Sequence, residues 1–182
     1  MKNSTFVHKY ISSLIDENDI VSDMTVGNGN DTLLLCKLAK KVYGFDIQEE
    51  AITKTKEKTK EYNNLILVKD NHTNVDLYIK EKIRLFIFNL GYLPNSDSKV
   101  ITKKDETLIA FKKAYDLLDD NGYIVITFYL GHIGGKDEYY LLEKYIKNNK
   151  LNIVEIYKEN KQLNEPITYI IKKKPQWAFS LC

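Results

Sequence analysis

An amide side chain follows a strongly apolar run in the middle of the chain. Residues 85–88 read LFIF, and Asn89 begins the segment Asn-Leu-Gly-Tyr-Leu-Pro that follows them. A β-branched and aromatic run that stops at a polar residue, a glycine and a proline indicates a buried strand that ends in a loop. Asn89 would then lie at the carboxyl end of a strand, the edge at which open α/β sheets bind ligands. The same pattern is also typical of an Asn that caps a turn beside a packed Tyr92.

A glycine-containing loop earlier in the chain predicts a second site. Residues 23–32 read DMTVGNGNDT, directly after an apolar run. Gly27 and Gly29 allow a tight turn and a close approach of the backbone to a ligand, and the helix expected next would present free N–H groups there. Asp46 ends the following apolar run, at about the spacing at which an acidic residue accepts hydrogen bonds from a ribose diol. The next run ends in Asp70, Asn71 and His72, so three successive strands end in polar groups along one rim.

The loop favours S-adenosylmethionine over a dinucleotide. A dinucleotide fold places Gly or Ala at the third position of Gly-x-Gly-x-x-Gly, but this chain has Thr32 there. Asp23, just before the loop, is poorly suited to a pyrophosphate. A carboxylate at that position suits the sulfonium and amino groups of S-adenosylmethionine.

Bulk properties set limits on the class of protein. The chain has 182 residues, 43% of them hydrophobic, which fits one globular domain. Its net charge of +2 neither indicates nor excludes binding to nucleic acid. The first residues contain no continuous apolar segment and no later stretch has the length of a membrane span, so we expect a cytoplasmic protein. Two cysteines form no metal-ligand pattern, and we expect no metal site.

Apolar runs alternate with segments of helical period along nearly the whole chain. Such alternation predicts βα units around a mostly parallel sheet. The expected helices cover 6–14, 31–40, 49–62, 75–79, 104–118 and 137–147, and the expected strands cover 20–24, 41–46, 65–68, 85–89, 123–129, 153–157 and 167–172. The last two strands are separated by too few residues for a helical crossover, and should therefore be antiparallel neighbours. The prediction is a Rossmann-like class I methyltransferase fold, with a seven-stranded sheet and helices on both faces. A single domain at 1–175 and a poorly ordered tail at 176–182 complete it.

With a methyl donor expected nearby, the Asn89 segment acquires a role. Residues 89–92 resemble the Asp/Asn-Pro-Pro-Phe/Tyr motif of amino-group methyltransferases, although Leu90 and Gly91 replace the two prolines. By that resemblance, the Asn89 side-chain oxygen and the Leu90 carbonyl accept hydrogen bonds from the target amine. They would aim its lone pair at the methyl carbon, while Tyr92 packs on the target base.

The chain as a whole resembles the YtqB-like putative rRNA methylase family, which includes MnmM-type transfer-RNA methyltransferases. The matching stretches are 25–32, 43–48, 87–94, 101–102 and 131–136, within a resemblance that covers about 4–175. It implies methylation of the aminomethyl group of wobble 5-aminomethyl-2-thiouridine in tRNA, with the anticodon stem-loop as partner and a homodimer as the assembly. The cofactor-binding residues predicted from the loop and the resemblance together are Asp23, Thr25, Gly27, Asn28, Gly29, Asp31, Thr32, Asp46, Ile47, Gln48, Asp70, Asn71, His72 and Asn89.

The target amine must lose a proton before it attacks. His132, in the loop at 130–136, is the leading candidate for the base. The same position also suits a histidine that only orders the loop. The predicted substrate contacts are Tyr92, Tyr129, His132, Lys136 and Asn164. Two rival hypotheses stay open at this point. One keeps the cofactor and moves the substrate to a ribosomal RNA base or a small amine. The other is a non-catalytic RNA-binding protein with a methyltransferase fold.

Overall fold

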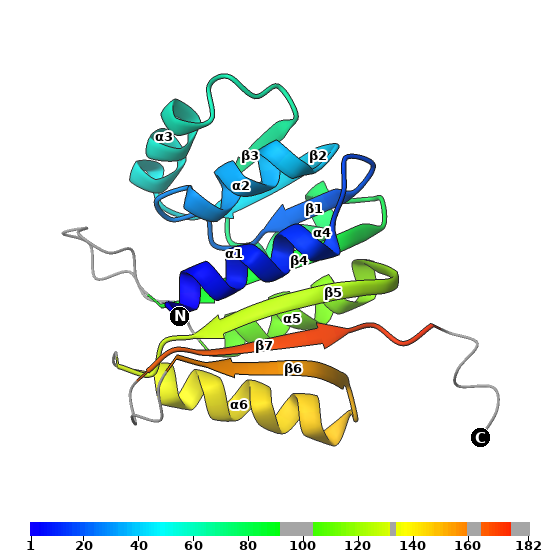
Figure 1. Cartoon of the computed structure of the whole chain (residues 1–182). Coiled ribbons are helices and arrows are strands. Elements are labelled where there is room, and N and C mark those ends of the chain that lie inside the picture. Colours follow the sequence, from blue (N-terminus) through cyan, green and yellow to red (C-terminus); the bar gives the residue numbers. More distant parts are fainter. Residues whose placement is uncertain (92–103, 132–133, 160–164, 176–182) are drawn as a thin grey trace.

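A seven-stranded sheet with helices on both faces forms the protein (Figure 1). This computed structural model describes residues 1–91, 104–131, 134–159 and 165–175. The strands are β1 (Ile20–Asp23), β2 (Lys41–Asp46), β3 (Leu65–Lys69), β4 (Ile83–Leu90), β5 (Leu118–Phe128), β6 (Asn152–Lys158) and β7 (Ile167–Lys172). The helices are α1 (Asn3–Leu14), α2 (Asn30–Leu38), α3 (Glu49–Lys58), α4 (Val75–Tyr78), α5 (Lys104–Leu117) and α6 (Gly135–Asn148), and a 3₁₀ turn, η1 (His72–Asn74), precedes α4.

The strand order is β3-β2-β1-β4-β5-β7-β6. The first five strands in chain order are parallel, and β7 pairs antiparallel with both β5 and β6. This confirms the predicted class I methyltransferase fold with its closing antiparallel pair. The order in which strands are added reverses between β1 and β4, because β2 and β3 extend the sheet on one side of β1 and β4 to β7 extend it on the other. At such a switch point the loops after the strands diverge and leave room for a ligand.

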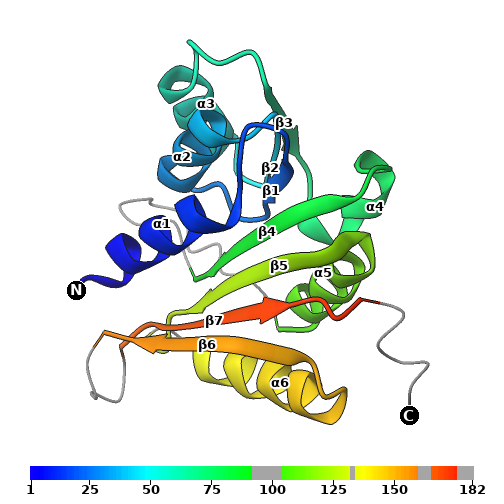
Figure 2. The same cartoon turned by 45° about the vertical axis from the view of Figure 1, so that its right-hand side comes forward.

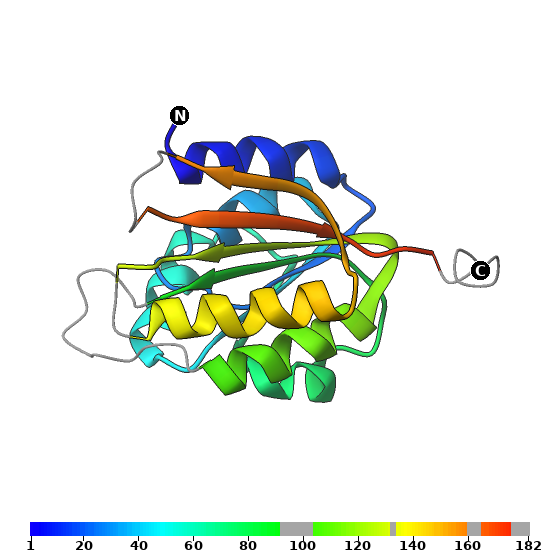
Figure 3. The ribbon, with the colours of Figure 1, turned by 90° about the horizontal axis from the view of Figure 1, so that it is seen from below.

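Two apolar layers hold the helices on the sheet. On one face, Val7 and Ile11 of α1 and Leu35 of α2 pack against β1, β2 and β4. On the other, Phe111 of α5 and Ile146 of α6 pack against the aromatic residues of β4 and β5. Figure 3 shows α1 on one side of the sheet and α5 and α6 on the other. In Figure 2, α2 and α3 lie beside the β3-β2-β1 half of the sheet, and α6 lies beside β6 and β7.

The predicted elements are all present, with small shifts at their ends. The helix expected to reach residue 62 ends at Lys58, where a turn bonds the Tyr62 N–H to the Thr59 carbonyl. β5 begins at Leu118, five residues before the predicted start. Its pairing with β4 is irregular there, and Asn121 adopts a φ of 64° before Gly122. No helix in the described part of the chain is long and apolar enough to cross a membrane.

Candidate functional site

A cavity of about 680 Å³ opens at the carboxyl ends of β1, β2 and β4, at the switch point of the sheet. Its volume lies in the range of sites for small organic ligands. The predicted cofactor residues that line it are Thr25, Gly27, Asn28, Asp31, Asp46, Ile47, Gln48, Asp70, Asn71, His72 and Asn89. Three predicted residues, Asp23, Gly29 and Thr32, do not line it. The rim expected from the strand ends is therefore one continuous wall.

The glycine loop is held by the carboxylate at the end of β2. One Asp46 oxygen accepts the backbone N–H of Gly27 at 2.9 Å and the other accepts that of Gln48 at 2.9 Å. Gly27 and Gly29 have φ values of 54° and 71°, a region that favours glycine. Because a carboxylate offers about four lone pairs, Asp46 retains acceptor capacity toward the cavity that it lines.

Asp23 lies inside the wall, behind the cavity. It is fully buried, accepts the Thr32 hydroxyl at 2.7 Å and accepts the Thr25 N–H at 3.1 Å. Burial and then the charge of Asp31 raise the pKa of Asp23 to about 7. The carboxyl group fixes the start of the loop to α2 and does not line the cavity, so the expected direct contact of Asp23 with a cationic ligand stays a prediction.

The end of β3 supplies a polar wall. The pKa of Asp70 lies below its usual value, because the carboxylate accepts the Tyr78 hydroxyl, the Asn71 N–H and the Asn74 amide. His72 is almost fully buried, and its Nδ1 lies 3.2 Å from the Met24 carbonyl oxygen. Burial lowers the pKa of His72, so the neutral imidazole donates from Nδ1. Its Nε2 atom is then an acceptor, and it is buried without a partner among the described residues.

Asn89 occupies the end of β4, on the edge of the cavity. Its backbone N–H donates to the Thr25 hydroxyl at 2.7 Å, and its Nδ2 donates to Asp31 at 2.6 Å. The neighbouring Leu90 side chain is fully buried, and its carbonyl oxygen already accepts the Tyr129 N–H at 3.3 Å within the sheet. A contact of that carbonyl with a target amine stays a prediction, and it would use the second lone pair.

The remaining predicted substrate residues are scattered or outside the described residues. Tyr129 lines the cavity and is 39% exposed, and burial of its hydroxyl raises the pKa of the phenol. Lys136 is exposed in the first turn of α6 and does not line the cavity. Tyr92, His132 and Asn164 lie outside the described residues, so their predicted roles stay predictions.

Helix α1 supplies site residues that the sequence did not reveal. Ser4 and His8, one helical turn apart, both line the cavity. His8 Nε2 lies 2.5 Å from Asp31 Oδ1, and this hydrogen bond, opposed by burial, raises the pKa of His8. Glu106 of α5 also lines the cavity and accepts the Asn71 amide at 2.9 Å. Spacing shows that residues 6–14 form a helix, but the sequence contains no signal that this helix crosses the mouth of the site.

Comparison with known proteins places this chain in a family. Residues 42–172 match the family model described as "Putative rRNA methylase". A plant protein from Arabidopsis thaliana, named tRNA (mnm(5)s(2)U34)-methyltransferase, chloroplastic, is 34% identical over 160 residues. That match covers 79% of this chain and 58% of the plant protein.

Two solved structures resemble the whole chain. A putative methyltransferase from Streptococcus mutans, in complex with SAH, is 38% identical with a TM-score of 0.86. A putative rRNA methylase from Clostridium thermocellum is 36% identical with a TM-score of 0.87. Each comparison covers 95% of this chain and 98% of the other.

Proposed function

Because the chain belongs to the putative rRNA methylase family, we propose that it is an S-adenosylmethionine-dependent methyltransferase that acts on a primary amine of transfer RNA. The target is the aminomethyl group of wobble 5-aminomethyl-2-thiouridine, and the product is the methylaminomethyl form. The name of the plant relative supports this substrate. The observation that carries the proposal is the Asn89 amide, which Asp31 orients at the edge of the cavity.

The described residues fit S-adenosylmethionine. Asp46 would accept the ribose hydroxyls, and the glycine loop would allow the ligand to approach the backbone. The buried, unpartnered Nε2 of His72 offers an acceptor in the same wall. When bound, S-adenosylmethionine supplies a methyl group whose bond to sulfur breaks as the bond to the amine nitrogen forms, leaving S-adenosylhomocysteine.

Asn89 gives the site its preference for an amine. With Nδ2 bonded to Asp31, the Oδ1 atom is the part of the amide available to a substrate, and it can only accept. A neutral amine donates N–H to this oxygen and keeps its lone pair free for attack. The proton that the ammonium form must lose passes to His132 or to water.

A ribosomal RNA base is the second candidate substrate, favoured by the description of the family model. An exocyclic base amine could donate to Asn89 in the same way. Incubation of purified protein and labelled S-adenosylmethionine with tRNA that carries the aminomethyl nucleoside, or with ribosomal RNA, separates the two. We expect the methylaminomethyl nucleoside in tRNA digests analysed by mass spectrometry. Label in ribosomal RNA alone would contradict the tRNA assignment, and label in neither RNA would contradict both.

Asn89→Ala tests the role of the amide. We expect the affinity for S-adenosylhomocysteine, measured by calorimetry, to be retained and most of the turnover to be lost, since the variant removes an acceptor for the target amine. Asn18→Ala, in the exposed turn between α1 and β1, is the matched control and should leave both quantities unchanged. A large loss of cofactor affinity in Asn89→Ala would show that the side chain serves the cofactor instead.

A further inference from the structure

Three side chains from three elements form one hydrogen-bonded row at the edge of the cavity. Asp31, in the first turn of α2, uses Oδ1 toward His8 of α1, at 2.5 Å, and Oδ2 toward the Asn89 amide, at 2.6 Å. The His8 and Asp31 side chains are 37% and 18% exposed, and all three residues line the cavity. In the proposed reaction Asn89 contacts the target amine directly, whereas His8 has no assigned role.

The row determines which end of the amide a substrate meets. An Asn side chain has a donor end and an acceptor end of nearly the same shape, and rotation by 180° exchanges them. The carboxylate of Asp31 accepts only, so it selects the orientation in which Nδ2 faces Asp31 and Oδ1 faces away. The position of the carboxylate itself depends on what occupies its other oxygen, and that partner is His8.

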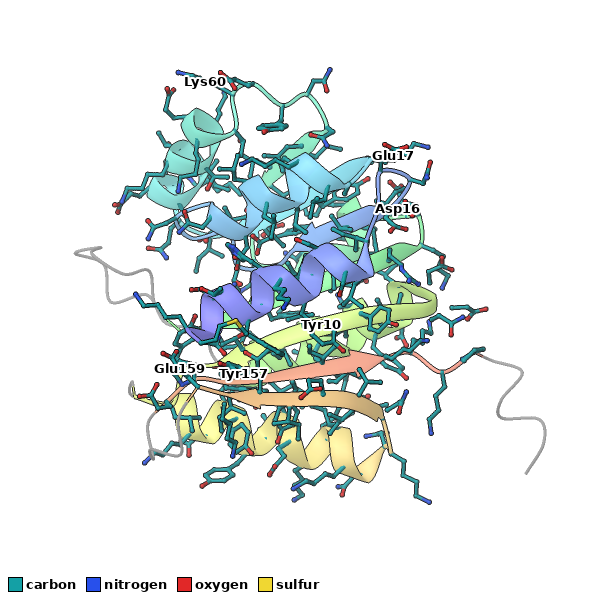
Figure 4. The ribbon with its side chains drawn as sticks, in the orientation of Figure 1. Tyr10, Asp16, Glu17, Lys60, Tyr157 and Glu159 are labelled. Atoms are coloured by element: carbon teal, nitrogen blue, oxygen red, sulfur yellow. The ribbon has the colours of Figure 1, made fainter. Side chains whose placement is uncertain are left out.

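Contacts at the start of α1 fix the position of this helix, and so the position of His8. Glu159, just after β6, accepts the Asn3 N–H at 2.8 Å, and the Tyr157 hydroxyl donates to the Met1 carbonyl. The Phe6 ring stacks on Tyr157 with centroids 3.8 Å apart. Figure 4 shows Tyr157 and Glu159 beside the first turn of α1. The helix that carries His8 is therefore tied to the far edge of the sheet.

We propose that His8 is a positioning residue of the methyl transfer, which acts through Asp31 to hold the Asn89 oxygen toward the target amine. This rests on the proposed function and deepens it. The imidazole donates from Nε2 to Asp31 whether it is protonated or neutral, so Asp31 remains the acceptor of both hydrogen bonds in either state. Two other titratable groups interact electrostatically with Asp31, namely Asp23 in the wall and Tyr129 on the cavity lining, and the charged Lys37 also lines the cavity.

Kinetics of His8→Ala, His8→Gln and Ser12→Ala test the proposal. His8→Ala should lower kcat by about tenfold to a hundredfold, because a small misplacement of a positioned group costs that much, while the dissociation constant for S-adenosylhomocysteine is unchanged. His8→Gln should recover most of kcat, since its amide N–H can donate to Asp31 from a similar distance. Ser12→Ala removes an exposed hydroxyl that donates to the His8 carbonyl one turn along α1, and should behave as the wild type.

A double variant separates positioning from a general loss of structure. In the Asn89→Ala background, His8→Ala should lower kcat no further, because nothing is left for it to orient. An equal loss in both backgrounds, or full activity of His8→Ala, would overturn the proposal. Failure of glutamine to rescue, with the fold intact by circular dichroism, would also overturn it.

An NMR titration of the protein without substrate tests the role of His8 separately from the proposed function. The imidazole of His8, assigned by its absence in His8→Gln, should titrate in NMR spectra above its ordinary pKa, and the pKa should fall in Asp31→Asn. An unshifted value would overturn the row of hydrogen bonds itself. A shifted value in a protein that methylates no amine would refute the proposed function, and the role of His8 with it. Methylation by wild type and His8→Ala alike would refute the role of His8 alone.

Discussion

Gly29→Ala is expected to destabilise the protein through two separate effects. Gly29 caps α2 with a φ of 71°, and a left-handed conformation costs a non-glycine residue about 1–2 kcal/mol. A Cβ atom there would also lie 2.4 Å from the Thr55 hydroxyl oxygen and 3.0 Å from its Cβ. Thr55 is fully buried in α3, so relief of this overlap costs a further 1–3 kcal/mol or so. The sum is about 2–5 kcal/mol, which for a chain of this size lowers Tm by about 4–20 °C.

Gly134→Ala is the matched control for the backbone effect. Gly134 caps α6 with a φ of 84°, and an added Cβ meets no described atom within 4 Å. The control should therefore lose only the conformational cost of about 1–2 kcal/mol. Thermal and urea unfolding followed by circular dichroism measure both variants.

Thr55→Ala identifies the overlap as the cause of the difference. The Thr55 hydroxyl is buried without a hydrogen-bond partner among the described residues, so its removal costs no hydrogen bond. In the double variant with Gly29→Ala, the new methyl group occupies the space that Thr55 vacates, and the loss should shrink toward that of the Gly134→Ala control. If Gly29→Ala is no less stable than that control, or if the double variant shows no recovery, the argument from close packing is wrong.

Two further predictions concern carboxylates of the site. Asp46→Ala should weaken binding of S-adenosylhomocysteine by about tenfold to a hundredfold, since the substitution removes a charged acceptor and releases the Gly27 and Gln48 N–H groups that the carboxylate holds. Calorimetry measures the affinity, and the control variant Asp46→Asn should lose less of it. An unchanged affinity in Asp46→Ala would contradict the proposed cofactor site. The pKa of Asp23 is about 7 in the folded protein against an ordinary value of 3.8. Between these two pH values the carboxyl group is protonated in the folded state and ionised in the unfolded state, so the free energy of unfolding falls as the pH rises through this range. Relative to Asp23→Asn, the wild type should lose roughly 2–3 kcal/mol of unfolding free energy between about pH 5 and about pH 8, and parallel pH profiles would refute the burial argument.

The parts of the site that lie at strand ends could be predicted from the sequence. Asp46, Asp70 and Asn89 each follow an apolar run, and parallel strands bring their carboxyl ends to one edge. The orientation of Asp23 could not be predicted, because Val21, Ser22 and Asp23 are all buried and no alternation shows which residue faces a ligand. His8 could not be found either, since its position depends on where α1 crosses the sheet. Contacts of α1 with residues at the end of β6, far away in the sequence, help to fix that crossing, and no local pattern describes them.

The tie between α1 and the end of β6 has a consequence for synthesis of the chain on the ribosome. Asn3 and Glu159, which seat the first helix, are 156 residues apart in the sequence. Contacts of such long range form only after the intervening loop has been closed. A nascent chain that has emerged as far as β5 already contains His8, Asp31 and Asn89 but lacks the strand against which Phe6 stacks. The amide that would receive the target amine is therefore fully supported only after β6 has been synthesised, so assembly of the site depends on a strand far along the sequence from α1.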